Sequence, residues 1–188
     1  MNPEYYPWGG DFTSCSPEGS VAVVLLTIAY TPPNEVAIYG PLKTENIGIE
    51  KIIANVISHP HIRYLVLCGE DIRGHRSGSS LVALHKNGID EQHRIINAPG
   101  AIPYIENLDT AALQRFQDQI EIVDLIGEHD TKKISTLIHQ YTAKTTQSFG
   151  EPYIAIRIKP ETQISINDKR ALHSKITINY LGKIRKRG

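Results

Sequence analysis

Two mainly apolar runs, each bounded by residues that end strands, most constrain the fold of this chain. Val21–Ile28 lies between Gly19 and Pro32-Pro33, and Ile62–Cys68 stops abruptly at Gly69. A strand that is apolar at successive positions is buried on both faces, as in a parallel sheet covered by helices. Both runs therefore predict buried strands of such a sheet.

Helical patterns alternate with strand patterns up to about residue 150. Thr44 and Asn46 are both available to cap the first helix, and Pro60 blocks its continuation. Four helices are predicted, over residues 44–58 and 79–86, from Asp109 or Thr110 to Ile120, and from Asp130 to Tyr141. Shorter strands are predicted over Val36–Tyr39, Arg94–Ile96 and Ile122–Ile126. This alternation predicts an α/β fold with a mainly parallel sheet flanked by helices.

The pattern changes after Gly150. Tyr153–Ile158, Ile164–Ile166 and Ile176–Tyr180 alternate with period two, which predicts half-buried, antiparallel strands. We therefore divide the chain into an α/β domain, residues 1–150, and a β-rich C-terminal extension with a basic tail, residues 151–188. The extension could enlarge the sheet, form a homo-oligomer contact or act as a lid, and the tail is expected to be solvated.

Composition excludes several classes of protein. The chain has 188 residues, 40% of them hydrophobic and 21% charged, which are globular values. Its formal net charge is zero, so nothing in the global charge favours binding to nucleic acid. Neither a signal peptide nor an apolar run of the ~18 residues needed for a membrane span is expected. Cys15 and Cys68 lie far apart in the sequence, so we expect a cytoplasmic protein without disulfides.

Common cofactor and metal motifs are missing from the sequence. Ala29-Tyr30-Thr31-Pro32-Pro33 follows the first strand, where a dinucleotide site would need a glycine-rich turn. There is no Walker lysine motif and no nucleophile-elbow serine. His59-Pro60-His61 places two imidazoles close together, but the sequence favours a helix-ending loop over a zinc site.

A candidate ligand site follows the second buried strand. Glu70 and Asp71 come directly after Gly69, and His75 then lies between Gly74 and Gly78. In open α/β sheets, ligands bind beyond the carboxyl ends of the strands. A histidine on a glycine-flanked loop at that edge is suited to meet such a ligand.

Three blocks of the chain resemble the A subunit of tetrahydromethanopterin S-methyltransferase. They are residues 41–58, Gly74-His75 with residues 83–88, and residues 100–108 followed by 120–126. The resemblance covers about residues 8 to 130 in unbroken order. It implies a Rossmann-like fold. It also implies a protein of methanogenic archaea that binds a corrinoid (cobalamin), whose cobalt carries a methyl group. Other methyltransferase subunits would then supply the transfer reactions.

The resemblance and the residue pattern both single out His75, and the resemblance implies that His75 is the axial ligand of cobalt. Other corrinoid proteins place an acid two residues before the histidine of their motif, whereas this chain has Arg73 there. The acid that orients the imidazole must therefore come from elsewhere. Glu45, Glu70 and Asp71 are the candidates, and Glu45 is preferred because it lies in the first block, at the neighbouring crossover.

Further residues are expected at the corrinoid site. Gly100 and other small residues would let the backbone approach a flat macrocycle. The serines after His75 could bind corrin amides or cap the next helix, and His85 is expected to pack on its helix. The complete set of expected cofactor-binding residues is His75, Glu45, Lys43, Thr44, Asn46, Gly74, Ser77, Gly78, Gly100, Ala101 and Pro103, with Ser79 and Ser80 as further serine candidates.

The resemblance leaves other functions open. The family's membrane-complex protein ends in a transmembrane anchor, whereas this chain ends in the β-rich segment, so a homologue serving a soluble methyl-transfer system is expected. No independent catalytic residue is evident, because the cofactor carries the chemistry. The alternatives are a metabolite-binding α/β enzyme and a regulatory module that senses corrinoid.

Overall fold

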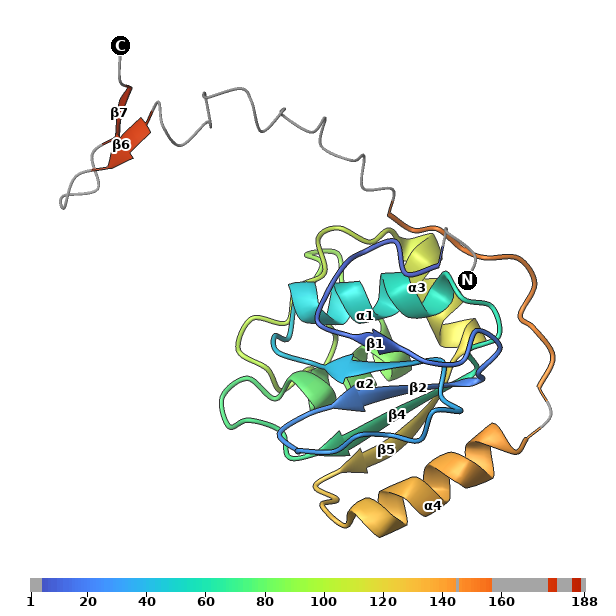
Figure 1. The fold of residues 1–188 in the computed structure, drawn as a ribbon. Helices are drawn as coiled ribbons and strands as arrows, with labels where there is room; N and C mark the ends of the chain where they lie inside the picture. The colour runs from blue at the N-terminus through green and yellow to red at the C-terminus, as the bar shows by residue number, and fades with distance from the viewer. Residues whose placement is uncertain (1–4, 145, 157–175, 179–183, 187–188) are drawn as a thin grey trace, which may run out of the picture. The chain divides into compact units, whose positions relative to one another are not determined.

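The fold was analysed in a computed structural model that describes residues 5–144, 146–156, 176–178 and 184–186. The chain divides into two compact units, Met1–Arg157 and Ile158–Gly188. The described part of the first unit contains a five-stranded sheet and four helices (Figure 1). In the second unit, β6 (Ile176–Ile178) pairs antiparallel with β7 (Ile184–Lys186).

The sheet of the first unit has the strand order β1-β3-β2-β4-β5. Its strands are β1 (Thr13–Ser14), β2 (Val21–Leu25), β3 (Ile38–Pro41), β4 (Tyr64–Gly69) and β5 (Glu121–Ile126). All neighbouring pairs are parallel except β1 and β3. The predicted α/β fold with a mainly parallel sheet is therefore confirmed.

Burial on both faces explains why β2 is apolar at every position. Ala22 and Val24 belong to the core formed with α1, α2 and α3, whereas Val21 and Val23 belong to the core formed with α4. Figure 1 shows α4 on the opposite side of the sheet from the other three helices. Successive side chains of a strand point to opposite faces, so two helical layers bury all of them.

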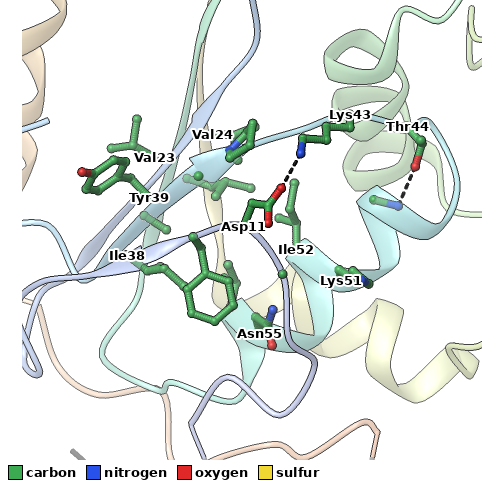
Figure 2. A pocket seen from close by; sticks show the side chains of 18 of the residues that line it. Asp11, Val23, Val24, Ile38, Tyr39, Lys43, Thr44, Lys51, Ile52 and Asn55 are labelled. Carbon is green, nitrogen blue, oxygen red and sulfur yellow. Dashed lines mark hydrogen bonds and ion pairs between the residues drawn. The ribbon is translucent and has the colours of Figure 1, made fainter. Parts of the chain in front are cut away.

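Three of the four described helices, α1, α3 and α4, have a polar side chain at or just before their first turn that caps free backbone N–H groups. The helices are α1 (Ile47–Ile57), α2 (Ser77–Asn87), α3 (Thr110–Gln119) and α4 (Thr131–Thr142). Asp109 and Asp130 cap α3 and α4 as predicted. At α1, Asn46 makes no side-chain cap, and Thr44 Oγ1 instead accepts a bond from Gly48 N–H at 2.9 Å (Figure 2). Every helix within the described ranges is too short or too polar to cross a membrane.

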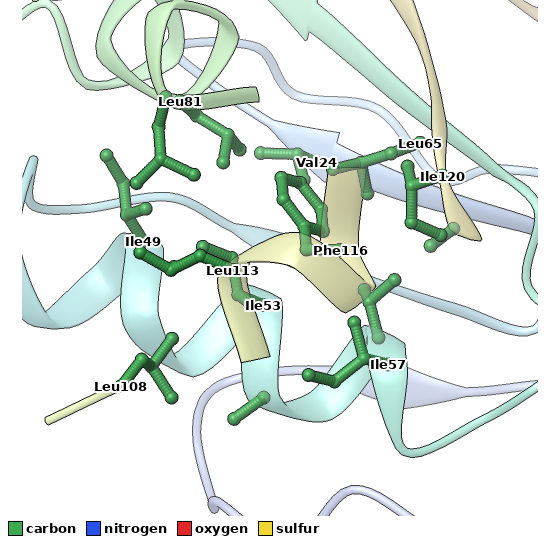
Figure 3. Packing of buried hydrophobic residues seen from close by; sticks show 14 of the residues in the cluster. Val24, Ile49, Ile53, Ile57, Leu65, Leu81, Leu108, Leu113, Phe116 and Ile120 are labelled. Carbon is green, nitrogen blue, oxygen red and sulfur yellow. The ribbon is translucent and has the colours of Figure 1, made fainter. Parts of the chain in front are cut away.

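The larger core lies between the sheet and the first three helices (Figure 3). α1 contributes Ile49, Ile53 and Ile57, which recur at the four-residue spacing that places them on one helix face. Phe116 of α3 packs in the same core, and all four of these side chains are fully buried. Burial of each such side chain contributes about 1.5–3 kcal/mol to folding.

The α/β domain departs from a regular alternation of strands and helices at two places, and the predicted strand at residues 94–96 is wrong. The connection from β2 to β3 crosses to the neighbouring strand without a helix. It contains Pro32-Pro33, which lack the N–H groups that a helix interior needs. Arg94–Ile96 is not a strand, because Arg94 and Ile95 form only isolated bridges, with Tyr104 and Ile89 respectively.

The segment after Gly150 is only partly as predicted. Residues 151–156 form no strand, although Tyr153, Ala155 and Ile156 pack against the larger core of the first unit. Tyr153 N–H donates to the Ile57 carbonyl at the end of α1. Residues 152–156 are all partly buried, so the period-two pattern here reflects neither strand pairing nor alternate burial.

The remaining C-terminal predictions concern the second unit. Ile176–Ile178 is a strand, as predicted. Ile164–Ile166 lies outside the described residues. Residues 184–186, expected as part of a solvated basic tail, instead form β7.

Candidate functional site

The strongest candidate site lies at the carboxyl edge of the parallel strands, where the loops after β3 and β4 meet. His75 comes from the β4–α2 loop and Glu45 from the β3–α1 loop. His75 Nδ1 lies 3.1 Å from Glu45 Oε2. The side chain of His75 is 59% exposed, whereas that of Glu45 is only 5% exposed. A buried carboxylate thus holds an imidazole at the surface.

Glu45 also binds a third segment of the chain. Its Oε1 accepts a bond from Ile102 N–H at 3.1 Å. Burial alone would raise the pKa of Glu45, but hydrogen bonds from its own backbone N–H, from Ile102 N–H and from His75 lower the pKa below its ordinary value. Glu45 is therefore ionised at neutral pH and acts only as a hydrogen-bond acceptor.

The state of Glu45 determines the tautomer of His75. Because an ionised carboxylate cannot donate, the proton of the shared bond belongs to His75 Nδ1. The other ring nitrogen, Nε2, then has a free lone pair on an exposed side chain. An imidazole held in this way is a good ligand for a metal whose remaining ligands come from a macrocycle.

Gly100 completes the junction of the three segments. Its N–H donates to Ser80 Oγ at 3.1 Å. A Cβ atom at this position would lie 2.7 Å from the His75 carbonyl oxygen and 2.7 Å from Ser80 Oγ. Only glycine lets the backbone at position 100 approach His75 and Ser80 so closely. The small residue that was expected to face a macrocycle therefore serves the packing of the His75 loop.

The other two candidate acids have different partners. Glu70 Oε2 lies 3.4 Å from His129 Nε2. Asp71 accepts bonds from Gly78 N–H, Ser79 N–H and Ser79 Oγ at 2.7–2.8 Å, and so caps α2 from seven residues upstream. Of the three candidate acids, the structure therefore pairs Glu45 with His75, as predicted.

Replacing Asp71 with Ala is expected to lower the free energy of unfolding by about 1–2 kcal/mol, the usual cost of losing a helix N-cap. Three donors at the start of α2 would lose their acceptor. Urea denaturation measures the effect, and Glu91→Ala, at an exposed position, is the control. Equal stability of the two variants would contradict this role of Asp71.

Most of the other expected site residues have structural partners. Lys43 forms an exposed ion pair with Asp11, and Thr44 caps α1. Asn46 is half-buried at the N-cap position of α1. Pro103 is buried, and its carbonyl accepts a bond from Ile95 N–H at 2.8 Å.

The remaining expected residues surround the His75 loop. Gly74 has a φ of +90° and is exposed, which suits the turn before His75. Ser77 and Gly78 are buried in the first turn of α2, and a Cβ at Gly78 would lie 2.7 Å from the Leu26 side chain. Ala101 is exposed beside Ile102.

The other histidines noted in the sequence lie away from this site. His59 is fully buried beside Tyr5 and Tyr6. In the described part of the chain, no cluster of three or more metal-ligating side chains includes it. His85 packs edge-on against Phe116, and its Nε2 lies 2.7 Å from the Ile120 carbonyl oxygen, as expected of a packed helix residue.

Sequence reasoning missed two features near the site. One is the backbone N–H of Ile102, which no side-chain pattern could have revealed. The other is a cavity of about 320 Å³ between the sheet and α1, lined in part by Lys43 and Thr44. The sequence holds no local signal for this cavity, because the cavity depends on the space left between packed elements.

Known proteins resemble this chain over most of its length. Residues 2–165 match the family model that describes the A subunit of tetrahydromethanopterin S-methyltransferase. The A subunit of the putative methyltransferase Mtx from Methanosarcina barkeri is 44% identical over 150 residues, which is 80% of this chain and 76% of the relative. An A subunit of tetrahydromethanopterin S-methyltransferase from Methanothermobacter thermautotrophicus is 46% identical over 80% of this chain, but the match spans only 65% of that relative. The chain therefore belongs to the family of tetrahydromethanopterin S-methyltransferase A subunits.

Proposed function

We propose that the protein binds a corrinoid through His75 and carries its methyl group between methyltransferase partners in the cytoplasm. The observation that carries this proposal is the Glu45–His75 pair, in which a buried acid presents an exposed imidazole nitrogen at the carboxyl edge of the sheet. Membership of the family supports the same function, because the relatives are named as methyltransferase subunits.

The surface around His75 fits a large, flat and partly apolar ligand. Ile72 and Ile102 are 56% and 58% exposed, and Ile47 is 39% exposed. The Ile72 carbonyl accepts a bond from His75 N–H, Ile102 N–H binds Glu45, and Ile47 follows Glu45 by two residues. Exposed apolar side chains that gather around one polar group are typical of binding sites.

Each segment of the site has a distinct part in holding the corrinoid. His75 Nε2 would bind the cobalt, and Glu45 would hold the imidazole in the required tautomer. The segment at Gly100–Ile102 would fix Glu45 through the Ile102 N–H. When bound, the corrinoid supplies a cobalt atom that accepts and releases the methyl group, while the protein positions it.

Replacing His75 with Ala is expected to abolish the change in the visible spectrum that marks imidazole ligation of cobalt. The measurement mixes the purified protein with hydroxocobalamin, removes unbound corrinoid by desalting and records the spectrum. His129→Ala is a matched control, because His129 is also exposed and paired with a glutamate, Glu70. Identical spectra for wild type and His75→Ala would refute the proposed ligation.

A further inference from the structure

Glu50 is a buried acid that the site described above does not use. It lies in the first turn of α1 and is only 1% exposed. Burial of a carboxylate costs free energy unless hydrogen bonds compensate for the lost solvation. Its Oε1 accepts bonds from Glu106 N–H at 2.5 Å and from Asn107 N–H at 2.7 Å, and its Oε2 accepts from Asn107 Nδ2 at 2.7 Å. All three donors belong to the connection between α2 and α3.

The same connection reaches the His75 site four residues before Glu106. Ile102 N–H donates to Glu45 Oε1 at 3.1 Å. Glu45 lies two residues before α1 and Glu50 lies in its first turn, so the start of one helix binds the connection at two places. Both acids are almost fully buried. The start of α1 therefore fixes residues 102–107 relative to the acid that holds His75.

Bonds within the connection maintain its shape but do not set its place against α1. Ile95 N–H donates to the Pro103 carbonyl, and Ile105 N–H donates to the His93 carbonyl. Both bonds join residues of the connection itself. Ile105 is also fully buried, but apolar packing is not directional, whereas a hydrogen bond sets the direction of its donor. The bonds to Glu50 therefore add an orientation of the backbone that packing does not provide.

We propose that Glu50 is a positioning residue for the corrinoid site. By holding the end of the connection, it keeps Ile102 N–H directed at Glu45, which in turn stays oriented towards His75. Without Glu50, the connection is free to move away from α1, and the Glu45 carboxylate loses one of its two restraints. This inference rests on the proposed function, in which the orientation of His75 determines how well it ligates cobalt.

Amide hydrogen exchange in the protein without corrinoid tests the first step. Glu50→Ala removes the acceptor of three donors. The Ile102 amide should then exchange about tenfold faster than in wild type, the factor that corresponds to losing one hydrogen bond to a charged group. NMR spectroscopy measures the rate at this amide. If Glu50 only stabilised the fold, exchange would accelerate through global unfolding, and amides of the interior strand β4 would change as much.

Two further variants separate the hydrogen bonds of Glu50 from its charge. Glu50→Gln should match wild type, because its oxygen can accept from both backbone N–H groups and its NH2 group can donate to Asn107 once that exposed amide turns over. Glu106→Ala removes an exposed acid of the same connection but keeps the backbone N–H, and should also match wild type. Exchange at Ile102 that is as fast in Glu106→Ala as in Glu50→Ala would overturn the role of Glu50.

Retention of hydroxocobalamin after desalting tests the second step. Glu50→Ala should lower retention by about tenfold, the lower end of the effect of losing a partner that orients a metal-bound histidine, because Glu45 itself remains. The visible spectrum of the retained corrinoid should also show less imidazole ligation of cobalt. Glu50→Gln and Glu106→Ala should retain as much corrinoid as wild type.

The outcomes separate this inference from the proposed function. If wild type binds corrinoid and Glu50→Ala retains it equally well, the inference is refuted and the proposed function stands. Unchanged exchange at Ile102 in Glu50→Ala refutes the inference whether or not corrinoid binds. If wild type binds no corrinoid, the proposed function fails, but faster exchange at Ile102 would still support the positioning of Glu45 by Glu50.

Discussion

Replacing Glu45 with Gln is expected to weaken retention of the corrinoid by about 10–100-fold, the usual effect of losing the acid that orients a metal-bound histidine. Glu45 accepts from both His75 Nδ1 and Ile102 N–H, through different oxygens. A glutamine has one oxygen and one NH2 group, so one of the two donors would face another donor. If the NH2 group faced His75, the ring would have to carry its proton on Nε2, which then could not bind cobalt.

Retention by Glu45→Gln is measured as the amount of corrinoid that stays bound to the protein after repeated desalting. Glu70→Gln is the matched control, because Glu70 lies at the same sheet edge but pairs with His129. Circular dichroism establishes that both variants are folded. Equal retention by wild type and Glu45→Gln would show that the Glu45 contact has no part in corrinoid binding.

Acidification is expected to destabilise the protein through His59. Burial lowers the pKa of His59 from 6.5 to about 4, with a smaller contribution from the charge of His61. Above pH 6.5 the imidazole is neutral in both the folded and the unfolded chain, and stability is unaffected. Between pH 6.5 and 4, only the unfolded chain binds the proton. The folded state should therefore lose about 2–3 kcal/mol of stability over this range, and the loss is complete below the folded pKa.

Urea denaturation at pH 7 and pH 4.5 measures this effect. His59→Leu places an apolar side chain at this buried position and removes two ring nitrogens that have no hydrogen-bond partner among the described residues. Its stability should depend less on pH than that of wild type, whereas His139→Gln, at an exposed site on α4, should match wild type. If the stability of His59→Leu depended on pH as strongly as that of wild type, His59 would not be the cause of the loss on acidification.

Local patterns in the sequence were sufficient to predict most of the regular elements. Ile49, Ile53 and Ile57 recur at helical spacing because one face of α1 is buried, and the apolar run of β4 reflects burial on both faces. Asp109 and Asp130 were predictable as caps because capping depends on residues close in sequence. The same patterns failed at Tyr153–Ile156, which packs on the larger core without pairing as a strand, because a period-two pattern does not reveal whether a neighbouring strand is present.

The site was predictable in part. His75 followed from its glycine-flanked position after a buried strand, and Glu45 was preferred through the resemblance to a family. The residues, however, do not by themselves distinguish Glu45 from Glu70 and Asp71, which are nearer to His75 in sequence. Tertiary structure separates them, because the β4–α2 loop turns Asp71 onto α2 and brings His75 against the β3–α1 loop.

By itself, the sequence determined the alternating elements, the caps and the strand-end position of His75, since these depend on side-chain periodicity and on near neighbours in the chain. Only the tertiary structure decided which acid meets His75, that Ile102 N–H shares this acid, and that a cavity opens beside Lys43 and Lys51. Each of these depends on segments from 30 to 57 residues apart or on space between packed elements. Pairing of this kind is set by the sheet order and by loop paths, which local patterns do not encode.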